Sequence, residues 1–146
     1  VLRSFFGKAY RKFQLKDAPP LMWGLHTLDG IVRDAPVVLA EGVKDAMFLN
    51  RFYPHVLAVL TNRLSDFQAD FLKRLTRRWV VAFDRDAAGR EAADKMCKRF
   101  RGRSVYLDRL VPPVKDWGMC FGNEAYERYT RRELTRSIRK LGGSVP

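Results

Sequence analysis

The chain has 146 residues, of which 47% are hydrophobic and 30% charged, so it can bury one sizeable core and is not a disordered polymer. No apolar run approaches the ~20 residues of a membrane-spanning helix, which argues against a membrane protein of that kind. Its 28 lysines and arginines outnumber 16 aspartates and glutamates, giving a net charge of +12. This excess indicates a polyanionic partner, nucleic acid above all, with a surface charged for solubility as the alternative.

Cysteine and histidine usage argues against a zinc site. The two cysteines, Cys97 and Cys120, form no CxxC pair, and His26 and His55 are the only histidines that could join them. We therefore expect no zinc, reduced thiols in the core and a cytoplasmic location. Val1 stands where an initiator methionine is expected, which indicates a piece of a larger protein.

Residues 1–35 are expected to form a basic N-terminal helix and an irregular connector. Apolar residues at positions 2, 5, 6, 9, 10 and 13 recur with helical spacing, and Pro19-Pro20 ends the pattern. We interpret this segment as a packing helix, with a nucleic-acid-binding arm as the alternative. The connector contains a candidate short strand over residues 30–32.

From residue 36 onward, strand and helix patterns alternate. Short apolar runs predict strands over residues 37–40, 56–60, 79–83 and 104–107. Helical spacing predicts helices over residues 43–53, 65–77 and 86–100. Ser65 and Gln68 form a capping box, and Met47 and Phe67 are among the side chains expected to be buried. The alternation is typical of an α/β fold with a parallel sheet and right-handed crossovers.

Residues 121–146 are predicted to form a basic helical tail. Thr130 and Glu133 have capping-box spacing, so a helix is expected to begin there. The arginine-rich stretch over residues 128–140 either follows a nucleic-acid backbone or is an exposed helix face.

Carboxylates end two of the predicted strands. The strand over residues 79–83 runs into Asp84 and Asp86, and the strand over residues 37–40 ends at Glu41. If these strands are neighbours, their carboxylates converge at one edge of the sheet and repel one another unless a cation joins them. Oxygen ligands suit Mg²⁺, which supports phosphoryl or nucleotidyl transfer or the related hydrolysis. Helix capping by Asp86 is an alternative that is compatible with metal binding.

Two motifs around these carboxylates resemble those of the Toprim family. Residues 41–46, Glu-Gly-Val-Lys-Asp-Ala, resemble its first motif, and residues 84–93, which begin Asp-Arg-Asp-Ala-Ala-Gly, resemble its second. The version is similar to that of bacterial and phage DNA primases. Three further segments support the primase branch, namely Trp23-Gly24-Leu25, residues 64–68 and Lys115-Asp116. The resemblance covers roughly residues 21–120.

The resemblance implies a Toprim fold, a four-stranded parallel sheet flanked by helices, with residues 36–120 as the catalytic domain. It implies that Asp84 and Asp86 hold Mg²⁺, for which Mn²⁺ can substitute. Glu41 is implied to act in acid/base chemistry or metal binding, and Asp45 and Asp116 are implied as secondary members of the metal site.

The activity that the resemblance implies is Mg²⁺-dependent nucleotidyl transfer, in which RNA primers are made from NTPs on single-stranded DNA. A small nuclease acting on RNA or DNA is one alternative, and a non-catalytic nucleic-acid-binding module is another. Template-binding parts would lie in further sequence or in a partner such as a helicase or another replication protein.

Basic residues near the acidic motifs are expected to contact nucleotide or nucleic-acid phosphates, with solvated surface charge as the alternative for each. They are Lys44, Arg63, Arg85, Arg90 and Lys115. Two of them depart from the primase pattern. Arg63 ends a Thr-Asn-Arg run where primases usually have Gly-Thr, and Arg85 stands where glycine is common.

Overall fold

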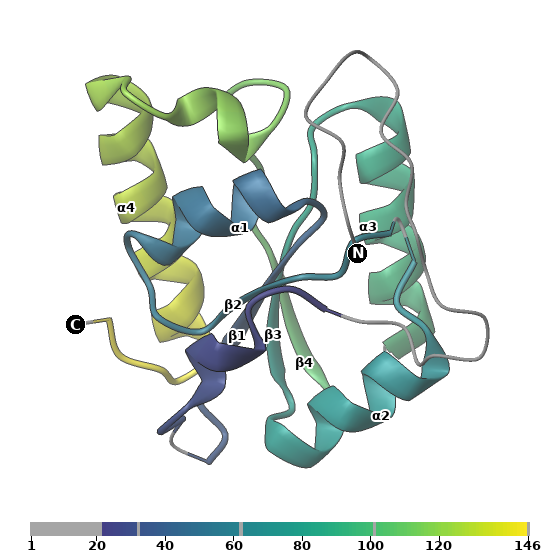
Figure 1. Ribbon diagram of the computed structural model, residues 1–146. Coiled ribbons are helices and arrows are strands. Elements are labelled where there is room, and N and C mark those ends of the chain that lie inside the picture. Colours follow the sequence, from purple (N-terminus) through teal and green to yellow (C-terminus); the bar gives the residue numbers. More distant parts are fainter. Residues whose placement is uncertain (1–21, 32, 62, 101, 146) are drawn as a thin grey trace.

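The computed structural model describes residues 22–31, 33–61, 63–100 and 102–145 (Figure 1). The helix predicted near the N-terminus lies outside the described residues. Within them, a single sheet has two helices against each face. This is the α/β architecture that the alternating strand and helix patterns predict.

The sheet has four parallel strands in the order β2-β1-β3-β4. Their bounds are Val37–Ala40 for β1, Val56–Ala58 for β2, Arg78–Ala82 for β3 and Tyr106–Arg109 for β4. The central strands β1 and β3 pair in register, with Ala40 opposite Ala82, so they end level with each other. The predicted fold class is confirmed, and so is the adjacency of the two strands that end in carboxylates.

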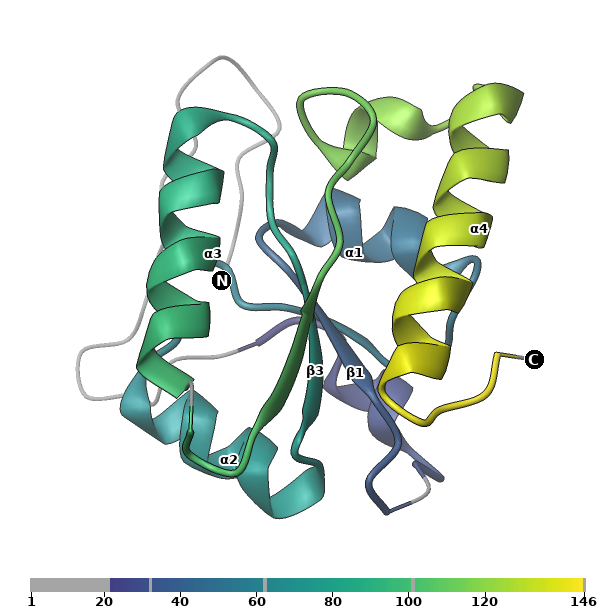
Figure 2. The ribbon, with the colours of Figure 1, turned by 180° about the vertical axis from the view of Figure 1, so that it is seen from behind.

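Four helices cover the two faces of the sheet (Figures 1 and 2). Their bounds are Val43–Asn50 for α1, Asp66–Leu75 for α2, Ala87–Phe100 for α3 and Glu124–Lys140 for α4. Alternate strand residues face opposite ways, so Val38 and Val80 pack with α1 and α4, whereas Leu39 and Val81 pack with α2 and α3. Two short 3₁₀-helices, η1 (Leu25–Leu28) and η2 (Trp117–Cys120), complete the helices of the described residues. No helix among the described residues is long and apolar enough to cross a membrane.

Several predicted boundaries differ from the observed ones by a few residues. The helix predicted over residues 43–53 ends at Asn50, and the strand predicted over 104–107 lies at Tyr106–Arg109. The capping box is confirmed, because the Ser65 side chain accepts from the Gln68 N–H and the Gln68 side chain accepts from the Ser65 N–H. The capped helix α2 therefore begins where the sequence predicts.

The strand predicted over residues 30–32 is wrong for its described part. Gly30 has a φ of 69°, and the Ile31 N–H donates to the Leu28 carbonyl, so the chain turns there. Trp23 instead forms an antiparallel bridge with Ala58 at the edge of β2, through two backbone hydrogen bonds of 3.0 and 2.9 Å. The connector therefore attaches to the sheet several residues earlier than expected.

The cap predicted at Thr130 and Glu133 is wrong, because one continuous helix begins at the Asn123 cap. The Asn123 side chain accepts from the Tyr126 N–H, and the buried Thr130 hydroxyl donates to the Tyr126 carbonyl one turn back. Two expectations of burial are also wrong, since Met47 is 52% exposed and Phe67 is 59% exposed. In α1, the neighbouring Phe48 fills the core position.

Candidate active site

The acidic motifs meet beyond the carboxyl ends of β1 and β3. Glu41 directly follows β1, and Asp84 follows β3 by two residues. Because Ala40 pairs with Ala82, the two carboxylates leave the sheet at the same end. In a parallel sheet this is the end at which ligands bind.

Asp84 is the carboxylate with the most unusual environment. Its Oδ1 is buried and accepts no hydrogen bond from the described residues. Burial raises the pKa of Asp84 to about 7, and the negative charges of four nearby carboxylates add to the effect, in the order Asp45, Glu41, Asp116 and Asp86. An ionised Asp84 therefore needs a positive charge beside it.

Asp45 is buried in the first turn of α1, where it joins two elements. Its Oδ1 accepts from the Gly118 N–H at 2.8 Å, which ties α1 to η2. Burial raises the pKa of Asp45, and the hydrogen bond from Gly118 opposes that rise. Its Oδ2 lies beside Gly42, where a Cβ would approach to 2.8 Å. Gly42 thus leaves room for the Asp45 carboxylate.

Asp86 caps the N-terminus of α3, and Asp116 caps that of η2. The Asp86 Oδ1 accepts from the Gly89 N–H at 2.9 Å, and the Asp116 Oδ1 accepts from the Met119 N–H at 2.8 Å. Capping by Asp86 is therefore confirmed. Each carboxylate has a second oxygen, so capping leaves both able to bind a ligand.

Gly89 permits a close approach between α3 and the turn that carries Asp84. A Cβ at this position would lie 2.4 Å from the Asp84 carbonyl oxygen and 2.9 Å from the Asp84 Cβ. Any side chain there would push the Asp84 backbone away. The glycine is thus required for packing against the acidic turn.

The residues present fit a divalent cation of the Mg²⁺ type. The donors are all oxygens, and a buried carboxylate oxygen lacks a partner among the described residues. No group of three acidic, histidine or cysteine side chains within the described part of the chain encloses an ion by itself. Mg²⁺ commonly takes only one or two carboxylates and completes its shell with water and phosphate oxygens.

Two of the predicted phosphate contacts hold the loops around the acidic residues. The Arg85 N–H donates to the Lys115 carbonyl at 2.8 Å, and the Arg85 guanidinium donates to the Pro113 carbonyl at 2.9 Å. The Arg90 guanidinium donates to the Arg85 carbonyl at 2.9 Å. Arg85 thus joins the turn after β3 to the loop before η2, Arg90 joins that turn to α3, and both side chains remain exposed.

The other two contacts predicted near this edge, Lys44 and Lys115, are also exposed. The stem of Lys44 crosses Gly118, where a Cβ would lie 2.8 Å from the Lys44 Cδ. Lys44 therefore packs against the glycine whose N–H holds Asp45. The structure brings four of the five predicted basic residues to the loops and first helical turns that carry the carboxylates.

Comparison with known proteins identifies the family of this chain. A family model described as Toprim-like matches residues 38–121, which is more than half of the chain. The chain belongs to the Toprim-like family. No curated protein matches it significantly.

Solved structures with the same fold as this Toprim-like chain include those of bacterial primases. The Aquifex aeolicus primase, comprising zinc-binding and RNA polymerase domains, matches 90% of this chain and 36% of its own, with a TM-score of 0.65 and 21% identity. The DnaG catalytic core matches 86% of this chain and 43% of its own, with a TM-score of 0.63 and 20% identity. The chain thus spans less than half the length of these structures, and the likeness establishes the shared fold.

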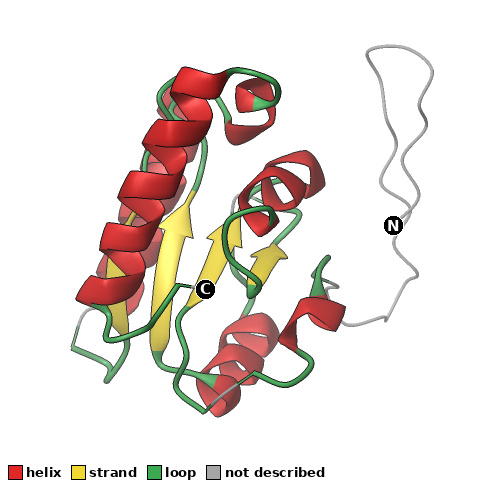
Figure 3. Ribbon diagram, turned by 90° about the vertical axis from the view of Figure 1, so that its left-hand side faces the viewer, coloured by secondary structure: helices red, strands yellow, loops and turns green. Residues whose placement is uncertain are grey.

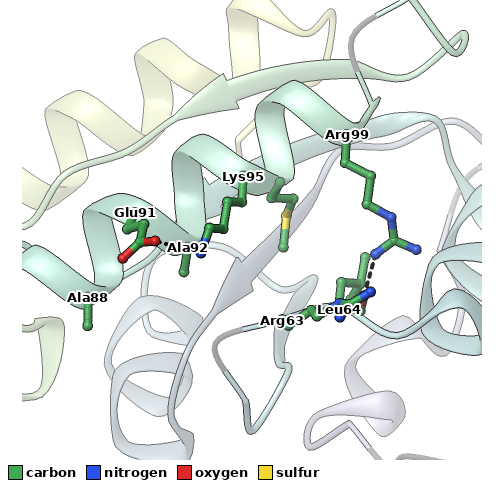
Figure 4. Close-up of a pocket in the computed structure, with 8 residues that line it drawn as sticks. Arg63, Leu64, Ala88, Glu91, Ala92, Lys95 and Arg99 are labelled. Carbon is green, nitrogen blue, oxygen red and sulfur yellow. Dashed lines mark hydrogen bonds and ion pairs between the residues drawn. The ribbon is translucent and has the colours of Figure 1, made fainter.

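Arg63, the fifth basic residue, lines a separate hollow of this Toprim-like domain (Figure 4). The hollow, of about 440 Å³, lies between α3 and the loop before α2. It is lined by Arg63, Leu64, Ala88, Glu91, Ala92, Lys95, Met96 and Arg99. Lys95 pairs with Glu91 at 2.5 Å, and Arg99 donates to the Leu64 carbonyl. The sequence interpretation omitted Lys95 and Arg99, although their spacing from Ala88 places all three on one side of α3.

Sequence reasoning also missed Gly118, whose N–H holds Asp45. Every residue except proline has a backbone N–H, so no pattern of residue types could have shown this contact. Trp117 was likewise not assigned a role. Its indole N–H donates to the Ala82 carbonyl at the end of β3, which anchors η2 to the strand that leads into Asp84.

Proposed function

We propose that this Toprim-like domain catalyses Mg²⁺-dependent nucleotidyl transfer, as the catalytic domain of a primase-type enzyme that makes RNA primers on single-stranded DNA. One observation carries the proposal. Asp84 has a buried oxygen that no described residue satisfies, and its burial and four other carboxylates raise its pKa. Keeping an ionised carboxylate in this environment costs folding free energy unless a cation, together with the phosphates that it binds, completes the site.

Each acidic residue has a part in this proposal. Asp84 and Asp86 would hold the cation, with Asp45 and Asp116 contributing negative charge around it. When bound, Mg²⁺ would supply charge neutralisation and orientation of phosphate oxygens. Glu41, at the end of the neighbouring strand, would accept the proton of the attacking hydroxyl or take part in metal binding. Mn²⁺ is expected to substitute for Mg²⁺.

The basic loops would bind the phosphates of the nucleotide or the template. Lys44, Arg85, Arg90 and Lys115 lie on loops and first turns next to the carboxylates, and Arg63 lies in the adjoining hollow. Since the chain spans less than half of the primase structures, further template-binding parts would belong to more of the protein or to a partner. A helicase or another replication protein is such a partner, and we place the protein in the cytoplasm.

The test supplies the purified chain with labelled NTPs, single-stranded DNA and Mg²⁺ or Mn²⁺, and follows both synthesis and cleavage. Asp84→Asn is expected to lower synthesis by about 100-fold or more, because it removes the charge that holds the cation. Asp70→Asn is the matched control, since Asp70 is exposed and pairs only with Lys73 at 3.1 Å among the described residues. Its activity should equal that of the original chain.

A second readout separates metal binding from turnover. Mn²⁺ binding, measured by electron paramagnetic resonance, should be abolished in Asp84→Asn and retained in Asp70→Asn. Cleavage of the strand in place of synthesis would replace the proposal with a nuclease. Metal binding that is indifferent to Asp84 would contradict the proposed site.

A further inference from the structure

One face of α4 carries a stripe of arginines that the acidic site does not use. A shallow groove of about 430 Å³ is lined by Arg128, Arg131, Arg132, Thr135, Arg136 and Arg139. These positions recur at helical spacing, so they form a single stripe along the helix. The opposite stripe, which includes Leu134 and Ile138, is buried against the sheet. The arginine face is thus directed away from the core.

The positive charge of this arginine face is only partly balanced. Arg128 pairs with Glu124 at 3.4 Å, and Arg132 and Arg136 pair with Glu133 at 2.9 and 3.2 Å. The side chains of these three arginines are 73%, 70% and 78% exposed, so the ion pairs are weak.

Arg131 and Arg139 form no ion pair with carboxylates of the described residues. Like charges one turn apart, as at Arg128 and Arg132, disfavour the helix. The arginine face therefore carries five positive charges, which only two glutamates partly balance, and the excess positive charge favours an anionic ligand.

Aromatic rings border the arginine face and favour a nucleic acid over an acidic peptide. The Arg131 guanidinium lies 5.3 Å from the centre of the Phe52 ring, and the Arg132 guanidinium lies 5.6 Å from that of Tyr129. The Arg51 guanidinium lies 5.6 Å from the same Phe52 ring and 5.7 Å from the ring of Phe121, which is 41% exposed. Arginines combined with rings that stay partly exposed, as Phe52, Tyr129 and Phe121 do, are typical of surfaces that bind single strands, because bases stack on rings while phosphates meet the cations.

The position of α4 connects this face with the acidic end of the molecule. Figure 3 shows α4 lying alongside the strands, with one end beyond their carboxyl ends. That end follows η2, which begins directly after Asp116. From Arg128 to Arg139 the helix advances about 16 Å, enough to face several phosphates of a strand. A strand leaving the acidic edge could therefore continue along the arginine face.

We propose that the arginine face of α4 binds the phosphate backbone of single-stranded nucleic acid at a surface separate from the acidic site. Within the described part of the chain, these arginines form ion pairs only with glutamates of α4 and none with the carboxylates of the acidic site. The proposed binding is therefore independent of catalysis at that site. The arginine face would then be a second binding surface, and its affinity for nucleic acid should depend strongly on salt concentration.

The experiment compares two fourfold variants of the whole chain that carry the same net charge. One is R128Q/R132Q/R136Q/R139Q, and the control is R74Q/R77Q/K98Q/R103Q, whose four positions are exposed and lie outside both sites. Binding of a fluorescent single-stranded DNA oligonucleotide is measured by anisotropy over a range of salt concentrations. We expect the plot of log affinity against log salt to become shallower by about 0.7 for each phosphate that the protein no longer neutralises, hence by about 2–3 in the first variant. The control should keep most of the original slope.

Two further measurements make the outcome decisive. The charge-retaining variant R128K/R132K/R136K/R139K should recover the salt dependence, which a mere folding defect in the glutamine variant would not predict. R128Q/R132Q/R136Q/R139Q should still bind Mn²⁺ as the original chain does, so a failure of the acidic site is distinguishable from a failure of this surface. Equal reductions in the glutamine variant and its control would overturn the proposal. Equally tight binding of a polyglutamate peptide at this face would also overturn it, in favour of an acidic protein partner.

Discussion

The acidic edge of the sheet and the arginine face of α4 differ in how the fold holds their charges. At the acidic edge, Asp45, Asp86 and Asp116 accept backbone N–H groups at 2.8–2.9 Å, and Asp84 is partly buried among them. On α4 the arginines are exposed, and within the described part of the chain they make weak pairs on their own helix or none. Packing and backbone hydrogen bonds therefore hold the carboxylates in place, whereas the arginines can be substituted with little effect on the fold.

The largest loss of folding stability at the acidic edge is expected from a substitution at Gly89. Gly89→Ala would place a Cβ 2.4 Å from the Asp84 carbonyl oxygen, and the backbone there cannot rotate away as a flexible side chain can. We expect a decrease of about 2–3 kcal/mol in the free energy of unfolding, even though alanine is the better helix former. Urea denaturation followed by circular dichroism measures this decrease.

Gly118→Ala is the matched control for that substitution. Its Cβ would meet the Lys44 stem at 2.8 Å, but that stem is exposed and can change rotamer. The expected change is below about 1 kcal/mol. Equal decreases at the two glycines would mean that the acidic turn is no more constrained than an ordinary loop.

A smaller effect is expected from the charge on Asp84 itself. Its pKa is about 7 in the folded chain and about 4 when unfolded, so the folded chain holds the extra proton between these values. Without a divalent cation, the free energy of unfolding should therefore fall as the pH rises from about 4 to about 7. Asp84→Asn should remove this contribution and be the more stable protein above pH 7, by about 1–2 kcal/mol after allowance for solvent screening.

The free energy of unfolding of both proteins is measured by urea denaturation at a series of pH values with chelator present. The value for one protein is subtracted from that for the other, so that the contributions of other titrating groups cancel. Adding Mg²⁺ above pH 7 should stabilise the original chain and leave Asp84→Asn unchanged. If the difference in free energy of unfolding between the two proteins does not change with pH, the Asp84 carboxyl titrates as an ordinary exposed group.

Most of the sheet, together with which strands are neighbours, could be predicted from the sequence. Apolar runs mark the strands clearly, and the carboxylates that end two of them indicate adjacency because isolated charges are costly there. The boundaries of β4 and the start of α4 could not be predicted in the same way. Exposed residues such as Tyr106 carry little periodic information, and Thr130 has the capping spacing but is satisfied inside a longer helix.

The acidic composition of the candidate site was also predictable, but its hydrogen bonds were not. The motifs predict that Glu41, Asp84 and Asp86 come to one edge, and the strand pairing agrees with this. The hydrogen bond from Gly118 to Asp45 depends on where the loop after β4 returns, which only the tertiary packing decides. The same holds for Arg85, whose guanidinium binds the Pro113 carbonyl.

The smallest effect is expected for the arginine face. Surface ion pairs contribute about 0–1 kcal/mol each, and neighbouring arginines offset them by repelling one another. R128Q/R132Q/R136Q/R139Q should therefore unfold within about 1 kcal/mol of the original chain, measured by urea denaturation in the same buffer. Its stability should depend less on salt than that of the original chain, because fewer like charges remain to be screened. A decrease as large as that of Gly89→Ala would mean that the arginines support the packing of α4, and that the two regions are held in the same way.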